Sequence, residues 1–281
     1  MFNEMLQGGL GEGDFGLIFG NPGGGKSWTL IALGAHAVSL GYNVIHYTLE
    51  LSEGYVGKRY DAFFTRISVD KLKVNKEKVV DATSDLPGQL IVKEYPMGKA
   101  SMSTIESHIK KCIDLDFKPD LVIIDYVDLL SSKRRNGERK EEIDDIYTST
   151  KGLARELKLP VWSVSQVNRA GAKDNIIEGD KAAGSYDKIM IADFAMSLSR
   201  QKKDKVNGTG RFHIMKNRYG MDGMTFNAKV DTSTGHIDIL NEMTEEEEDA
   251  QNVRPKQSKT EIGLDNLDKE YLAKQFFALN K

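Results

Sequence analysis

The chain has 281 residues, of which 40% are hydrophobic and 29% are charged, so it can form one large α/β domain around a sizeable core. Its formal net charge of -3 excludes nucleic-acid binding by a uniformly basic surface, so any such contact must come from local loops or a channel. A single cysteine, Cys112, excludes an intrachain disulfide, and the chain has neither an apolar run of about 18 residues nor a basic signal-peptide start, so we expect a cytoplasmic protein without membrane contact.

The first part of the chain alternates strands with helices. Residues 15–19 form a short apolar run between glycines, which predicts a buried strand, and residues 28–40 have helical spacing. A second strand is expected over residues 43–49 and a second helix over residues 51–66. Residues 68–88 show no clear period.

The middle of the chain continues this alternation. Ser103 and Glu106 form a capping box, which predicts a helix from there to about residue 113. Four consecutive aliphatic residues at 121–124 predict a strand that is buried on both faces. The other elements expected here are a short strand at 90–92, a helix that ends near residue 157 and a strand at 161–165.

The last third begins with a long polar loop over residues 168–185, and loops of this length are usually functional or mobile. Four alternating segments then predict strands. They lie at residues 194–199, 211–216, 225–230 and 236–240, with turn signals at Asn207-Gly208 and Thr234-Gly235. The order of elements predicts an α/β fold with a largely parallel central sheet, flanked by helices and extended by antiparallel edge strands.

Composition changes near the end of the chain. The run from Glu245 to Asp249 is acidic, and the following residues are polar without a period. We therefore expect a main domain over residues 1–242, a disordered acidic linker over 243–262 and a short helical tail over 263–281.

A phosphate-binding loop is predicted between the first strand and the first helix. The motif G-x-x-x-x-G-K-S/T is matched by Gly20, Asn21, Pro22, Gly23, Gly24, Gly25, Lys26 and Ser27. Backbone N–H groups and the helix N-terminus can surround phosphate oxygens, while Lys26 meets the β- and γ-phosphates and Ser27 ligates Mg²⁺. We expect ATP and Mg²⁺ as cofactors, with Trp28 as a further nucleotide contact; the alternative is a glycine-rich turn before a helix.

Two carboxylates follow predicted strands at the same edge of the sheet. Asp125 follows the aliphatic strand and can accompany the metal, although a strand-end cap is the alternative. Glu50 ends the second strand and can act as general base on the attacking water, although a solvated surface charge explains it equally well.

Residues 20–27, 48–51, 121–125 and 165–169, in this order and at these spacings, resemble the RecA-like motor domain of DnaB-type replicative helicases. The late motif Lys216-Asn217-Arg218 looks like the Lys-x-Arg element of this family, and the resemblance covers about residues 5–240. It implies a RecA-like P-loop NTPase fold and a ring, hexameric, that moves along single-stranded DNA in the 5′–3′ direction while it hydrolyses ATP.

The resemblance also assigns roles to matching residues. Glu50 looks like the catalytic glutamate, Asp125 like the metal-associated acid, and Gln166 like the sensor that links the γ-phosphate to the DNA loops. Arg218, with Lys216 beside it, resembles the arginine finger that reaches the ATP of the neighbouring subunit. The alternatives are a packed polar strand end for Gln166 and solubilising charges for Lys216 and Arg218.

DNA contacts are expected from two loops. One carries the basic cluster at residues 133–140, with Lys133, Arg134 and Arg135; the other matches the family's central loop and carries Arg169, Lys173 and Lys181. For the first cluster a solvated surface loop remains the alternative.

Two departures from the family pattern stand out. The phosphate loop begins at residue 20, so we expect the chain to lack the N-terminal helical domain that usually supports the ring and contacts primase. No arginine follows Asp180 in the way that the family's Asp-Leu-Arg element would require. A compact motor of this kind looks virus-encoded, which would place it in the host cytoplasm, with primase or a loader protein as possible partners.

Two other functions stay open. A recombinase-like ATPase of the same superfamily would form filaments, and a nucleotide-switched adaptor or loader ATPase would not unwind DNA.

Overall fold

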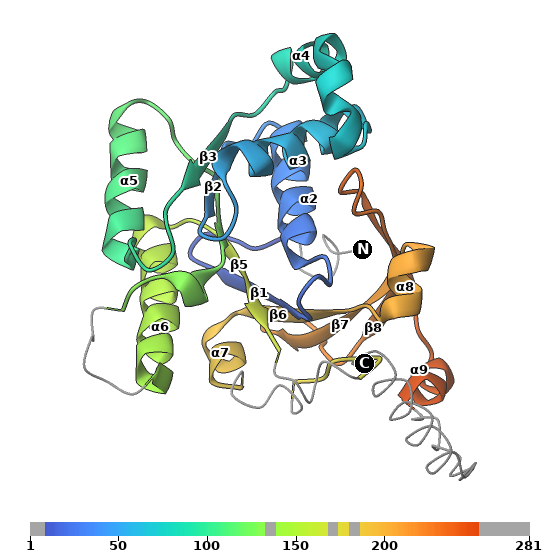
Figure 1. Ribbon diagram of the computed structural model, residues 1–281. Coiled ribbons are helices and arrows are strands. Elements are labelled where there is room, and N and C mark those ends of the chain that lie inside the picture. Colours follow the sequence, from blue (N-terminus) through green and yellow to red (C-terminus); the bar gives the residue numbers. More distant parts are fainter. Residues whose placement is uncertain (1–8, 133–138, 168–173, 180–185, 253–281) are drawn as a thin grey trace, which may run out of the picture.

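The computed structural model describes residues 9–132, 139–167, 174–179 and 186–252 (Figure 1). Within these ranges a nine-stranded sheet has the order β3-β2-β4-β5-β1-β6-β7-β8-β9. Its strands are β1 (Phe15–Gly20), β2 (Val44–Thr48), β3 (Leu90–Glu94), β4 (Leu121–Asp125), β5 (Val161–Gln166), β6 (Phe194–Ser199), β7 (Thr209–Asn217), β8 (Thr225–Val230) and β9 (Ile237–Glu242).

The α-helices of the described residues are α2 (Lys26–Ser39), α3 (Glu53–Thr65), α4 (Lys76–Ser84), α5 (Met102–Asp114), α6 (Arg139–Leu157), α7 (Tyr186–Ile191), α8 (Lys202–Asn207) and α9 (Glu245–Asn252). The 3-10 helices there are η1 (Val69–Val74) and η2 (Val127–Leu129). No helix in the described ranges combines the length and the apolar composition that a membrane crossing requires.

The strands from β3 to β6 in sheet order run parallel, so their carboxyl ends lie at one edge of the sheet. β7, β8 and β9 extend the sheet with antiparallel pairs. The predicted fold class, an α/β fold with a largely parallel sheet and antiparallel edge strands, is therefore confirmed.

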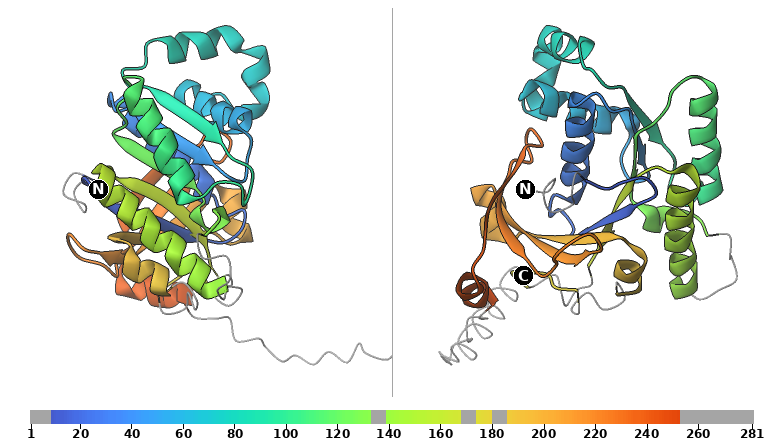
Figure 2. Two further views of the ribbon diagram at one scale, coloured as in Figure 1. Left: turned by 90° about the vertical axis from the view of Figure 1, so that its left-hand side faces the viewer. Right: turned by 180° about the vertical axis from the view of Figure 1, so that it is seen from behind.

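Helices cover both faces of the parallel part of the sheet. On one face α5, α6 and α7 pack through Ile105, Ile146 and Ile189, and on the other α2 packs through Leu30 and Val38 (Figures 1 and 2). Every residue of β1, β2 and β4 is buried, because both faces of these strands are covered. This burial explains why residues 15–19 and 121–124 read as apolar runs.

The predicted start of α5 is wrong by two residues. The N-cap is Ser101, whose hydroxyl accepts a hydrogen bond from the Thr104 N–H in a capping box with the Thr104 side chain, whereas the sequence favoured Ser103 with Glu106. Thr104 takes the part usually played by a glutamate or glutamine, so the usual pattern selected a neighbouring pair.

Other differences concern short helices in the second half. Gly208 adopts φ 65° and ends α8, so the predicted turn at Asn207-Gly208 is instead the C-terminus of a helix. The acidic run that begins at Glu245 forms α9, where the sequence predicted irregular structure. The division into domain, linker and tail stays a prediction, since residues 253–281 lie outside the described ranges.

Candidate functional site

A cavity of about 370 Å³ lies at the carboxyl edge of the parallel strands. Neighbouring strands each contribute to it: Glu50 follows β2, Asp125 ends β4 and Gln166 ends β5. The loop after β1 and the residue after β6 complete this edge. The lining residues are Pro22, Gly23, Gly24, Gly25, Lys26, Ser27, Trp28, Glu50, Leu51, Arg59, Asp125, Tyr126, Val164, Gln166, Arg200, Lys205 and Thr232.

The loop between β1 and α2 has the backbone that a phosphate site needs. Gly23 and Gly25 have φ values of 63° and 104°, a region that favours glycine, and Gly25 is the N-cap of α2 without a side-chain hydrogen bond to the helix. A Cβ on Gly20 would lie 2.8 Å from the Leu198 carbonyl oxygen. The N-terminus of α2 therefore faces the cavity with its backbone N–H groups, as anion sites do.

Lys26 is almost buried within this loop. Its Nζ donates to the carbonyl oxygens of Gly20 at 2.8 Å and Asn21 at 3.0 Å. Burial lowers the pKa of Lys26 to about 8, and the nearby carboxylates of Asp125 and Glu50 oppose this shift. The ammonium is thus held at the mouth of the loop by carbonyls that cannot neutralise it, which favours an anionic ligand.

Asp125 is 2% exposed, and its Oδ1 has no hydrogen-bond partner among the described residues. Burial raises the pKa of this carboxyl group, while a hydrogen bond from Ser27 and the charge of Arg59 lower it. A buried oxygen without a donor, beside a serine hydroxyl, suits a hard cation such as Mg²⁺, which takes few protein ligands and completes its shell with phosphate and water. Ser27 and Asp125 therefore fit the metal role expected from their positions in the sequence.

Glu50 and Gln166 flank Asp125 across the cavity. Glu50 is exposed to the cavity, and Gln166 Nε2 lies 3.5 Å from the Tyr126 hydroxyl oxygen, at the limit of a hydrogen bond. Within the described part of the chain, neither side chain makes a strong contact that would keep it from a ligand in the cavity.

Trp28 and Arg59 form one wall. The Arg59 guanidinium carbon lies 4.6 Å from the centre of the Trp28 ring, and Arg59 Nε is buried without a hydrogen-bond partner in the described ranges. The stacked pair places a cation beside the carboxylates of Glu50 and Asp125.

Two cations in the cavity were not singled out from the sequence. Arg200 follows β6, donates through Nε to the Thr209 carbonyl at 2.8 Å, and places Nη1 3.4 Å from where a Cβ on Gly25 would lie. Lys205, on α8, lies 3.6 Å from the corresponding point on Gly23. The available signal was position: Arg200 directly follows β6, the strand next to β1, at the carboxyl ends of the parallel strands, where ligands bind in such sheets.

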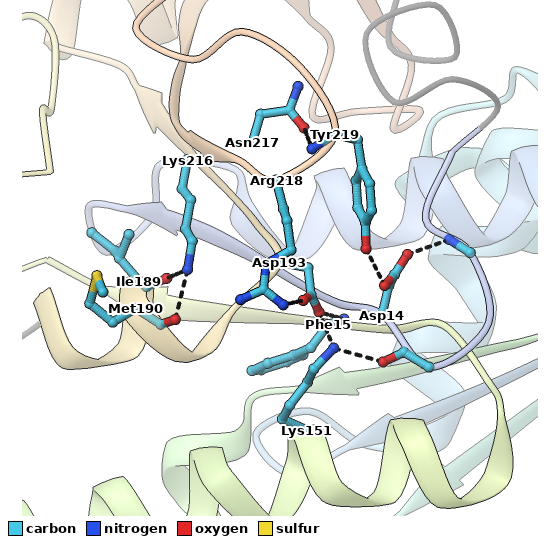
Figure 3. A network of polar contacts seen from close by, with 12 residues as sticks. Asp14, Phe15, Lys151, Ile189, Met190, Asp193, Lys216, Asn217, Arg218 and Tyr219 are labelled. Carbon is cyan, nitrogen blue, oxygen red and sulfur yellow. Dashed lines mark hydrogen bonds and ion pairs between the residues drawn. The ribbon is translucent and has the colours of Figure 1, made fainter.

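Lys216 and Arg218, which Figure 3 shows with their contacts, lie at the amino end of β6, whereas the cavity lies at the carboxyl ends of the parallel strands. β7 is antiparallel to β6, and Asn217 pairs with Phe194 at the amino end of β6, whereas Gly20 pairs with Leu198. The end of β7 therefore lies about 13 Å from the end of β1, measured along β6. Arg218 is 49% exposed and bound to Asp193, while Lys216 donates to the carbonyl oxygens of Ile189 and Met190. The structure therefore does not bring this pair to the cavity of its own chain.

The predicted DNA contacts fall outside the described residues. They are Lys133, Arg134, Arg135, Arg169, Lys173 and Lys181. Their chain neighbours are described: η2 and α6 flank the first segment in the sequence, and β5 and α7 flank the second (Figure 1).

Comparison with known proteins agrees with this geometry. Residues 1–234 match the family described as DnaB-like helicase C terminal domain. The chain belongs to this family. The fold of this DnaB-like domain is also that of a solved structure described as an ATPase domain, with a TM-score of 0.72 and 22% identity over 85% of this chain and 90% of that one. The predicted RecA-like fold is thereby confirmed.

Curated relatives are longer proteins. The DnaB-like replicative helicase of Enterobacteria phage T4 is 25% identical over 236 residues, which are 78% of this chain and 49% of that protein. A probable plasmid replicative DNA helicase of Chlamydia trachomatis is 28% identical over 57% of this chain and 36% of its own length. A structure described as a DnaB-like replicative helicase and its interactions with primase has a TM-score of 0.71 at 22% identity, over 83% of this chain and 59% of that one. The DnaB-like domain thus spans about half the length, or less, of these curated relatives.

Proposed function

We propose that this DnaB-like chain is an ATP-hydrolysing helicase motor that assembles as a hexameric ring and moves 5′–3′ along single-stranded DNA. The observation that carries the proposal is the distance, along the strands, between Arg218 and the cavity of the same chain. Lys26, Asp125 and Glu50 meet at the cavity, while Arg218 lies half-exposed at the opposite edge. A second copy that applies its Arg218 turn to the cavity of the first completes the site, and in the proposed ring the rotation between successive copies closes this head-to-tail contact on itself.

The residues at the cavity divide the chemistry of phosphoryl transfer among them. The loop N–H groups and Lys26 bind the phosphates of ATP, and Glu50 accepts a proton from the attacking water. Mg²⁺, held by Ser27 and Asp125 with the phosphates, would supply neutralisation of the charge that develops on them. Arg218 of the neighbouring copy, with Lys216, stabilises the transferring phosphoryl group, and Trp28, Arg200 and Lys205 give the nucleotide further contacts.

The proposed movement on DNA depends on the two chain segments that follow β5 and precede α7. Gln166 ends β5 directly before the segment with Arg169 and Lys173, and α7 follows the segment with Lys181. A contact from Gln166 to the γ-phosphate would change on hydrolysis and shift these cations along the phosphate backbone. Replicative helicases are named among the relatives, and one related structure is described with primase, which supports primase or a loader as a partner.

The site assignment is tested by hydrolysis with and without single-stranded DNA. Lys26→Ala removes the phosphate-binding ammonium and Glu50→Gln the general base, so both variants should lose DNA-stimulated hydrolysis. Arg218→Ala should bind ATP normally and hydrolyse it about 1,000-fold or more slowly, as loss of an arginine finger does. Lys78→Ala, an exposed lysine on α4, is the control and should match the wild type.

Mixing variants tests the division between copies. A Lys26→Ala subunit has an intact Arg218, and an Arg218→Ala subunit has an intact cavity, so the mixture should hydrolyse ATP faster than the sum of the two alone. Full activity of Arg218→Ala alone would refute a shared site. Filaments in electron micrographs would favour a recombinase, and hydrolysis indifferent to DNA an adaptor ATPase.

A further inference from the structure

A buried carboxylate lies at the base of the Arg218 edge. Asp193 immediately precedes β6 and its side chain is 1% exposed. Its Oδ2 accepts the Phe15 N–H at 2.8 Å and a hydrogen bond from Lys151 Nζ, and its Oδ1 accepts Arg218 Nη1 at 2.8 Å (Figure 3). The contacts from Phe15 of β1 and Lys151 of α6 hold the carboxylate in place independently of Arg218, so it can act as a rigid acceptor.

The backbone at Arg218 is held as firmly as its side chain. The Arg218 N–H donates to the Asp193 carbonyl at 3.0 Å, and the next residue, Tyr219, donates its hydroxyl to the carboxylate of Asp14. The turn after β7 is therefore attached at two successive residues, by Arg218 to the segment that leads into β6 and by Tyr219 to the segment that leads into β1. With the backbone fixed, the direction of the arginine side chain depends on the contact that its guanidinium makes with Asp193.

The charges at this edge allow Arg218 to serve two acceptors. Lys151, whose side chain is 12% exposed, also donates to the Gly13 carbonyl and stays beside Asp193, so the carboxylate keeps a counter-charge of its own. A guanidinium has five N–H groups in a planar fork, and Asp193 takes one of them. With the side chain 49% exposed, the remaining donors can meet an anion outside the molecule.

We propose that Asp193 is the positioning residue of the arginine finger, a role that rests on the proposed function. The buried carboxylate holds one edge of the Arg218 guanidinium and presents the other edge to the ATP phosphates of the adjacent copy. Lys151 holds Asp193 in place while it does so. The finger is thereby oriented before the neighbour's nucleotide arrives, and its side-chain entropy is largely lost in advance.

Asp193→Asn tests this role, because it keeps the size of the side chain and turns an amide towards Arg218. Misplacement of a catalytic group by about 1 Å can slow a reaction about 100-fold, so kcat should fall on that order while the affinity for ATP at the variant's own cavity stays unchanged. Lys78→Ala, which removes an exposed charge on α4, is the control, with near-normal kcat expected.

Mixing variant subunits distinguishes a positioning role of Asp193 from a purely structural one. Asp193→Asn subunits have a sound cavity, so Lys26→Ala subunits, which have a sound finger, should restore hydrolysis as they do for Arg218→Ala. Restoration with Arg218→Ala but not with Asp193→Asn would overturn the positioning role and leave the shared site intact. Restoration with neither would instead refute the shared site on which the inference rests.

A measurement on the wild-type chain covers the case in which Asp193→Asn does not fold. With ¹⁵N-labelled arginine, a guanidinium held by Asp193 should give resolved, slowly exchanging Nη signals without nucleotide, assigned by their loss in Arg218→Lys. Averaged Nη signals for Arg218 would show a freely rotating side chain and would contradict the proposal.

Discussion

At the scale of single residues, Lys26 shows how the site prepares for an anion. The surrounding loop and strands bury its ammonium, which lowers its pKa to about 8, and the carbonyl oxygens of Gly20 and Asn21 are its acceptors in the absence of a ligand. A triphosphate replaces these neutral oxygens by charged ones, so binding raises the pKa of Lys26 again. Binding above about pH 8 therefore requires proton uptake, whereas binding below it does not.

This linkage predicts the pH dependence of ATP affinity. Lys26 is cationic below its pKa of about 8 and neutral above it, so the dissociation constant should rise about tenfold between pH 7 and pH 9. Isothermal titration of the wild type at several pH values measures the change. Lys26→Arg keeps its charge over this range and should bind with little pH dependence, whatever its absolute affinity. A constant affinity of the wild type up to pH 9 would contradict the lowered pKa.

Three of the residues that sequence reasoning placed at the cavity share one property: each ends or follows a parallel strand. Asp125, Glu50 and Gln166 could be predicted to converge because the carboxyl ends of parallel strands lie at one edge. Arg200 has the same property, but its strand carried no motif, and Lys205 lies on α8, a helix that was not predicted and whose end at Asn207-Gly208 was predicted as a turn. Without a motif, a charged residue of a ligand site cannot be distinguished from an ordinary charged surface residue until the sheet order is known.

At the scale of elements, a helix could be predicted from the sequence where it has an amphipathic period. α4 has no buried residue, so residues 76–84 carry no apolar stripe and show no helical signal. α5 buries Ile105 and Ile109 on one face, and its existence was predicted although its N-cap was not. Long elements that pack on the sheet were therefore predictable, and short or exposed ones were not.

The attachment of α7 depends on a buried ion pair. Lys188 Nζ donates to Asp128 Oδ1 at 2.5 Å and to Ser165 Oγ at 2.9 Å, and lies 4.9 Å from the centre of the Tyr147 ring. Tyr147 also donates to the other oxygen of Asp128. These contacts tie α7, which follows the segment with Lys181, to the strand ends that carry Asp125 and Gln166.

Lys188→Met should therefore destabilise the fold strongly. It keeps most of the aliphatic stem but removes the Lys188 ammonium from the buried ion pair with Asp128, which costs about 3–5 kcal/mol. Urea unfolding of both proteins measures the difference, provided that the slope with denaturant is unchanged. Lys140→Ala, the control, removes an exposed ion pair between α6 and Asp187 of α7, and solvent screening should make its effect on the unfolding midpoint much smaller. Equal losses would mean that the buried pair contributes no more than the exposed one.

At the scale of the whole molecule, the two edges of the sheet have complementary chemistry. The carboxyl edge presents a cavity lined by the phosphate loop and two carboxylates, and the opposite edge presents Arg218 on a turn fixed by Asp193 and Asp14. The antiparallel return of β7 creates this separation. Antiparallel edge strands were predicted from the sequence, but the pairing of β7 with β6, which sets this separation, was not.

The separation predicts that hydrolysis depends on assembly while nucleotide binding does not. The groups that we assign to phosphate binding in one chain lie at its own cavity, so ATP affinity should be constant with protein concentration. The rate per subunit should rise with concentration and level off as neighbours supply Arg218, with the midpoint near the dissociation constant of the assembly. The slow residual rate of Arg218→Ala should not rise in this way. A wild-type rate per subunit that is constant from dilute monomer to assembled protein would show that each chain completes its own site.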